Sequence, residues 1–124
     1  MKGHSLIDSF KDALNGIAVP ATKERNLNIH IIIMLIVIIA GFILKINKIE
    51  WIICIILFAL VISAEVMNTA IENAIDYTRD VTVDADHELA GLAKDTSAGA
   101  VLILAIASAI VGLIIFIPKI IALF

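Results

Sequence analysis

Four polar residues recur at helical spacing in a stretch of the chain that follows directly on an apolar run: Glu65, Asn68, Glu72 and Asp76. At about 100° per residue they fall at about 0°, −60°, −20° and +20°, so all four share one narrow stripe of a helix. Carboxylates can hold a divalent cation or accept a proton, and an amide can orient a substrate. The spacing therefore predicts a site for chemistry along one helix face.

Glu65 is the member of this stripe that lies deepest in an apolar run. The run begins at Trp51, 14 residues earlier, which places Glu65 about 21 Å along the axis of a membrane helix, in the last third of a ~30 Å hydrocarbon core. A carboxylate there costs a few kcal/mol and by default indicates a functional site. Its partial desolvation suits a general base for a lipid hydroxyl. Glu72, about 10 Å further along, belongs near the headgroups.

Other polar residues lie next to the apolar runs. Glu24 precedes the first run and, like Glu72, belongs at the interface, where the two carboxylates can hold Mg²⁺. Lys94, on a later helix, can neutralise phosphate charge, and phosphoryl transfer depends mostly on positioning and electrostatics. A carboxylate at the end of a span is ordinarily just solvated, so these residues count only as a set. His30, at the end of an apolar run, is expected to be interfacial rather than a ligand.

The composition of the chain indicates which kind of fold holds these residues. The chain has 124 residues, of which 61% are hydrophobic, and a mean hydropathy of +1.07. These values are typical of a small integral membrane protein. We predict one all-α membrane domain over residues 1–124, with a surface helix at 5–19 and transmembrane helices at 29–45, 51–75 and 85–117, the last with a cytoplasmic extension. A bundle this small favours a homo-oligomer.

The N-terminal helix is predicted from its amphipathic pattern. Its apolar positions repeat at helical spacing: Leu6, Phe10, Ala13, Leu14 and Ile17. Ser5 is a suitable N-cap, and Pro20 is expected to end the helix, as Pro118 is expected to end the last span. Such a helix either lies in the plane of the membrane interface or packs on its own protein.

The Lys and Arg residues predict the orientation. Six lie in the N-terminal segment or in the connection over residues 76–95: Lys2, Lys11, Lys23, Arg25, Arg79 and Lys94. Three lie on the opposite side: Lys45, Lys48 and Lys119. Because cytoplasmic segments carry the excess of positive charge, we expect a multi-pass protein of the cytoplasmic (inner) membrane with a cytoplasmic N-terminus. The acidic stripe then faces the compartment that contains ATP.

Two motifs carry a resemblance to a known family. The first is Glu65-Val66-Met67-Asn68-Thr69-Ala70-Ile71-Glu72, with Asp76 four residues further on. The second is His87-Glu88-Leu89-Ala90-Gly91-Leu92-Ala93-Lys94-Asp95. With these motifs, and with Glu24 ahead of the first span, nearly the whole chain resembles the prokaryotic diacylglycerol kinase family, which includes undecaprenol kinases. The connection between the two motifs is longer than is usual in that family.

The resemblance implies a homotrimer of three-span subunits that share active sites and phosphorylate a lipid hydroxyl with MgATP. By position, Glu65 resembles the catalytic base, Glu24 and Glu72 the carboxylates for Mg²⁺ and ATP, and Asn68 a supporting residue at the lipid substrate. Further ATP contacts are implied at Asp86, His87, Lys94 and Asp95.

The lipid acceptor and the class of function stay open at this point. The segment over residues 24–30 resembles the undecaprenol kinases, and the segment over residues 87–91 resembles the diacylglycerol kinases, so undecaprenol is slightly favoured. The alternative from another class is a small proton-coupled transporter subunit with Glu65 as the exchange site. A third is a structural or regulatory membrane subunit. No phosphate-binding loop of the soluble kinases is present, and nucleic acid is not expected as a partner.

Overall fold

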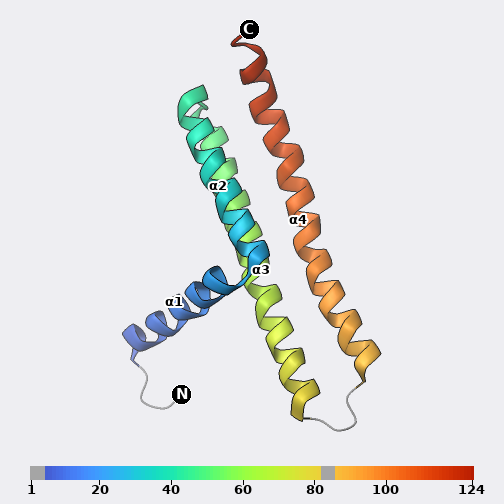
Figure 1. Ribbon diagram of the computed structural model, residues 1–124. Helices are drawn as coiled ribbons and strands as arrows, with labels where there is room; N and C mark the ends of the chain where they lie inside the picture. Colours follow the sequence, from blue (N-terminus) through green and yellow to red (C-terminus); the bar gives the residue numbers. More distant parts are fainter. Residues whose placement is uncertain (1–4, 82–85) are drawn as a thin grey trace.

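The computed structural model describes residues 5–81 and 86–124, apart from the side chains of Thr22 and Lys23. Within these residues it has four helices and no strand (Figure 1): α1 (Leu6–Lys23), α2 (Arg25–Leu44), α3 (Lys48–Val81) and α4 (His87–Ile121). The predicted all-α fold class is thus confirmed. Two positions used in the predictions, Lys2 and residue 85 at the start of the third predicted span, lie outside the described residues.

Helix α1 begins as its sequence predicts. The Ser5 hydroxyl accepts the backbone N–H of Asp8 at 3.2 Å, and the Asp8 carboxylate accepts the backbone N–H of Ser5 at 3.3 Å, which forms a reciprocal capping box. The helix continues through Pro20, where we expected it to end. Proline removes only its own N–H donor, whereas its carbonyl still accepts the N–H of Glu24 at 2.8 Å. Helix α4 continues through Pro118 in the same way.

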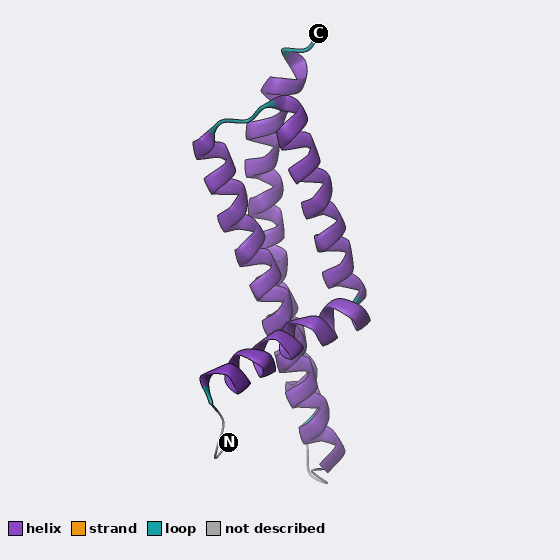
Figure 2. Ribbon diagram, turned by 90° about the vertical axis from the view of Figure 1, so that its left-hand side faces the viewer, coloured by secondary structure: helices purple, strands orange, loops and turns teal. Residues whose placement is uncertain are grey.

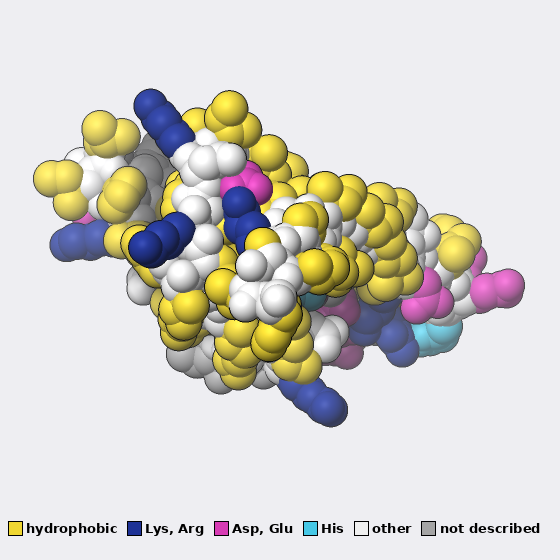
Figure 3. All heavy atoms as spheres, turned by 90° about the horizontal axis from the view of Figure 1, so that it is seen from above, with side chains coloured by type: hydrophobic (Ala, Val, Ile, Leu, Met, Phe, Trp, Pro, Cys, Tyr) yellow, Lys and Arg dark blue, Asp and Glu magenta, His cyan; other side chains and the backbone are white. Residues whose placement is uncertain are grey.

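Among the described residues, α2, α3 and α4 are long and apolar enough to cross a membrane. Most of their large apolar side chains point outward, and hydrophobic side chains cover much of the face seen in Figure 3. In water this arrangement would leave the hydrophobic effect unsatisfied, whereas in a bilayer the lipid tails solvate the same surface. The structure is therefore that of a multi-pass membrane protein.

The helices are arranged as a three-helix bundle with α1 across it. Figures 1 and 2 show α1 lying at a steep angle to the bundle, while α3 and α4 continue beyond it at the end away from the C-terminus. The connection between α2 and α3 lies at the same end as the C-terminus. The ends of α3 and α4 that carry the two motifs are therefore neighbours.

Small-residue packing fixes the start of α3 against α2. A Cβ added to Gly41 would lie 2.7 Å from Cη2 of Trp51, so only a glycine lets the indole ring approach the α2 backbone this closely. Phe42 lies beside the same ring, with centroids 4.9 Å apart. Asn47 and Glu50 exchange hydrogen bonds of 2.8 and 2.9 Å at the start of α3, and Lys119 of α4 lies 3.1 Å from Glu50.

Candidate active site

Glu65 is buried in the middle of the bundle. Its side chain is only 5% exposed, and its Oε1 lies 3.1 Å from Nε2 of His30 on α2. One turn further along α3, the Thr69 hydroxyl donates to the backbone carbonyl of Glu65 at 3.1 Å, so this polar side chain is satisfied locally. The His30 contact therefore supplies the partner that a buried carboxylate needs.

Asn68 and Glu72 continue the stripe on the same helix. The Asn68 amide donates from Nδ2 to Oε1 of Glu72 at 3.3 Å. Asn68 is itself 8% exposed, and its Oδ1 is buried without a hydrogen-bond partner among the described residues. An unsatisfied buried carbonyl oxygen is rare in proteins, so this atom is a candidate contact for a ligand.

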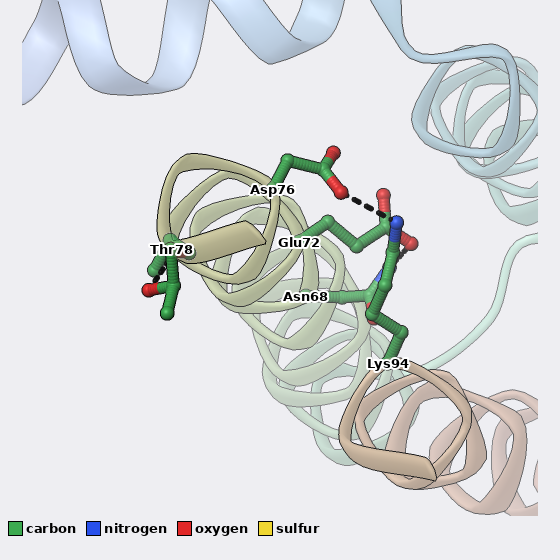
Figure 4. Close-up of polar contacts among 6 residues, drawn as sticks. Asn68, Glu72, Asp76, Thr78 and Lys94 are labelled. Atoms are coloured by element: carbon green, nitrogen blue, oxygen red, sulfur yellow. Dashed lines mark hydrogen bonds and ion pairs between the residues drawn. The ribbon is translucent and has the colours of Figure 1, made fainter. Parts of the chain in front are cut away.

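Asp76 and Lys94 connect the stripe to α4. The Lys94 ammonium lies 2.8 Å from Oδ1 of Asp76, and both side chains are partly exposed. Figure 4 shows the Lys94 side chain reaching from α4 across to Asp76 on α3. The structure thus brings four of the predicted site residues, from both motifs, into one cluster of charged and amide groups.

The other residues implied as ATP contacts lie at or near the start of α4. Asp86 is the N-cap, and its Oδ1 accepts the backbone N–H of Leu89 at 2.9 Å. His87 and Asp95 are exposed. The positive end of the α4 dipole and the exposed side chains suit a phosphate-bearing ligand in water.

Glu24 lies apart from the cluster. It is half-buried between α1 and α2 and lines a cavity with α1 residues and one face of α3, represented by Val66, Thr69 and Asn73. Glu72 and its partner Asn68 lie on a different side of α3. A single chain therefore does not bring Glu24 and Glu72 together in any contact that the described residues show.

The oxygen atoms of Glu72 and Asn68 are the kind of ligand that Mg²⁺ prefers. No group of three His, Cys, Asp or Glu residues forms a metal-binding cluster within the described parts of the chain. Mg²⁺ that accompanies a nucleotide needs only one or two carboxylates, because phosphate oxygens and water complete its coordination. The Glu72 carboxylate, with the unpartnered Oδ1 of Asn68 nearby, offers oxygen atoms of this kind.

An apolar cavity of about 490 Å³ lies between the three spans, and His30, the partner of Glu65, is part of its lining. His30 of α2 and Ser108 of α4 are the polar members of its lining, and the Ser108 hydroxyl is buried without a partner among the described residues. His30 thus lies between Glu65 and this cavity.

His30 is the residue of this site whose partner sequence reasoning did not find. We expected an interfacial side chain rather than a ligand, and the structure places it against Glu65; its depth in the membrane stays a prediction. A signal was present in the sequence, since His30 lies at the beginning of the first apolar run and Glu65 near the end of the second. In consecutive antiparallel spans, these positions have similar depths.

Comparison with known proteins identifies the family. The sequence model described as prokaryotic diacylglycerol kinase matches residues 11–116. The chain belongs to this family. A Bacillus subtilis protein named undecaprenol kinase is 43% identical over 111 residues, which cover 90% of this chain and 87% of the relative. A Synechocystis protein named diacylglycerol kinase is 36% identical over 119 residues, which cover 96% of this chain and 66% of the relative. No solved structure matches the chain.

Membership of this family confirms two of the predictions. The chain is an enzyme of the lipid kinase class, and the resemblance stated from its two motifs is correct. Both motifs fall inside the matched residues, as do Glu24, His30 and every other predicted site residue. The cluster around Glu72 and the buried Glu65 are therefore the candidate active site of a kinase.

Proposed function

We propose that this protein transfers the γ-phosphoryl group of MgATP to the hydroxyl of a membrane lipid at the cytoplasmic interface. The observation that carries the proposal is the position of Glu65. It is a buried carboxylate in an apolar span, at the end of the polar stripe that lies deepest in the membrane. The other end of the stripe is the partly exposed Asp76–Lys94 pair. A lipid hydroxyl and a water-soluble phosphoryl donor can meet along such a stripe.

In the proposed reaction, Glu65 accepts the proton of the lipid hydroxyl. The hydroxyl oxygen forms a bond to the γ-phosphorus, and the bond between that phosphorus and the β–γ bridging oxygen breaks, which releases ADP. Positioning and electrostatic stabilisation provide most of the catalysis in such transfers. Asn68, between Glu65 and Glu72 on the stripe, would be a supporting residue at the acceptor, and its amide donates to Glu72.

The nucleotide would lie at the exposed end of the stripe. We assign Glu24 and Glu72 to the Mg²⁺ of MgATP, and Asp86, His87, Lys94 and Asp95 to contacts with ATP. Lys94 is suited to phosphate because its ammonium is held over the stripe by Asp76. When bound, the metal would neutralise phosphate charge as the transfer proceeds.

A homotrimer is part of this proposal. Glu24 and Glu72 lie on different sides of α3 in one chain, so a neighbouring subunit would be needed to place both carboxylates at one nucleotide. The broad apolar surfaces of α2, α3 and α4 offer room for such contacts as well as for lipid. We place the protein in the cytoplasmic membrane with its N-terminus inside, as its charge distribution favours.

Undecaprenol is the favoured acceptor, and diacylglycerol, which would yield phosphatidic acid, is the alternative. The relative named undecaprenol kinase shares 43% of its aligned residues with this chain, compared with 36% for the relative named diacylglycerol kinase. The segment over residues 24–30 also resembles the undecaprenol kinases.

A competition assay tests the proposal. Purified protein in mixed micelles receives Mg²⁺, γ-labelled ATP, and undecaprenol and diacylglycerol at equal mole fractions, and the labelled lipids are separated. We expect label mainly in undecaprenyl phosphate, dependence on Mg²⁺, and none with Glu65→Gln. Label mainly in phosphatidic acid would reassign the acceptor. If folded protein labels neither lipid, the proposed function is contradicted. The alternative of a proton-coupled transporter subunit is then favoured.

A further inference from the structure

The environment of Glu65 contains a second side chain that the proposed reaction does not yet use. His30 Nε2 lies 3.1 Å from Glu65 Oε1, and the two residues come from different spans, α2 and α3. Their side chains are 22% and 5% exposed, so the contact is formed largely away from water. A polar interaction between two membrane helices at this depth is too costly to be incidental.

The chemistry of the contact defines what His30 can do. The imidazole approaches Oε1 through Nε2, and an N–H at this nitrogen can hold one oxygen of the carboxylate in place. The contact uses Oε1, which leaves Oε2 to accept the proton of the lipid hydroxyl. It also restricts the side-chain rotation of Glu65, since the carboxylate is held from the neighbouring helix rather than from its own.

We propose that His30 is the positioning residue of the catalytic base: it holds the Glu65 carboxylate directed at the acceptor hydroxyl. This inference rests on the proposed kinase function and adds a residue to it. The position of His30 fits this role, because the imidazole lines the apolar cavity between the three spans and contacts Glu65, which is not part of that lining.

Three substitutions of His30 distinguish the effect of its N–H donor from the effect of its side-chain volume. His30→Gln keeps an amide N–H near the place of Nε2. His30→Asn keeps the same amide on a shorter side chain, nearer the place of Nδ1, and His30→Leu removes the donor. We measure kcat, the KM for lipid and for MgATP, and the thermal unfolding midpoint in detergent.

We expect His30→Leu to lower kcat by roughly 10–100-fold, because a misplaced reacting group costs up to about that much. His30→Asn should behave similarly, and His30→Gln should recover kcat to within a few-fold of the wild type. Neither KM should change by more than a few-fold. The control is Glu50→Gln, which breaks the Lys119 pair at the opposite end of the bundle and should leave kcat unchanged.

Several results would overturn the inference. Unchanged kcat in His30→Leu would do so, as would an equal loss in all three His30 variants or a change confined to KM. If the wild-type protein is active and one of these results is found, the proposed kinase function is retained and His30 has no positioning role in it. Absence of wild-type turnover with either lipid removes the function itself, and the positioning role with it.

A second measurement tests the contact without turnover. His30→Leu and Glu65→Leu, which each remove one partner of the contact, are combined in a double-mutant cycle read by the unfolding midpoint. We expect the double variant to depart from the sum of the single variants by more than ~2 °C, because each substitution removes the same contact. Additive shifts would show that the two side chains are not coupled in the folded protein, and would overturn the inference.

Discussion

The ammonium of Lys94 lies 2.8 Å from the carboxylate of Asp76, which joins α4 to α3 where the polar stripe leaves the apolar region. The residues are 18 positions apart in the sequence and belong to different motifs. Both side chains are partly exposed, so the pair adds little to stability. Its consequence is positional: it holds the Lys94 ammonium at Asp76, one helical turn beyond Glu72 on the same stripe (Figure 4).

Lys94→Met should lower kcat/KM for ATP by about 10²-fold, because a cation that stabilises transferred phosphate charge is lost. Asp76→Asn should have a smaller effect, since it loosens the ammonium but keeps it. Steady-state kinetics with varied MgATP checks both. Lys119→Met, which breaks the ion pair at the other end of the bundle, is the matched control. Wild-type kcat/KM in Lys94→Met would remove Lys94 from the ATP site.

Glu65→Gln should reduce turnover by at least about 10²-fold, because the base is lost while the volume is kept. The Gln carbonyl can still accept the N–H of His30, so the fold and the oligomer should be unaffected. Single-turnover assays and size-exclusion chromatography in detergent provide the two readouts. Retention of more than a few per cent of the wild-type rate would mean that another group is the base.

Glu24→Gln and Glu72→Gln should each raise the Mg²⁺ concentration for half-maximal activity by roughly tenfold, because each removes a charged oxygen ligand. Mg²⁺ titration at fixed ATP measures this, with Glu50→Gln as the same chemical change at the opposite end of the bundle. If both titrations match the wild type, the two carboxylates do not hold the metal.

Gly41→Ala should destabilise the protein by about 1–3 kcal/mol, because the new methyl group would overlap the Trp51 ring. Gly112→Ala is the matched control, since a Cβ there meets nothing within 4 Å. Thermal unfolding in detergent compares the two variants. Equal midpoints would mean that Trp51 moves aside freely, and that the close approach of α2 and α3 at this point is not required.

Much of the fold followed from local signals. Long apolar runs predict membrane spans because a helix of that length and composition is stable in the hydrocarbon core of a bilayer. The N-cap at Ser5 was predicted from its residue type. The helix ends at Pro20 and Pro118 were not predicted correctly. The carbonyls of Pro20 and Pro118 still accept the N–H groups of Glu24 and Ala122, so each helix keeps its last turn after the proline.

The stripe of Glu65, Asn68, Glu72 and Asp76 was determined by the sequence alone, because helical geometry fixes which residues of one helix share a face. The partners on other helices were decided by tertiary structure. His30 meets Glu65, and Lys94 meets Asp76, through the relative rotation and sliding of whole helices, which depend on packing over their full length. Local periodicity contains no information on that register. Because periodicity does not determine how helices pack, Glu24 was grouped with Glu72 from their similar depth alone. Packing within one chain places Glu24 beside another face of α3.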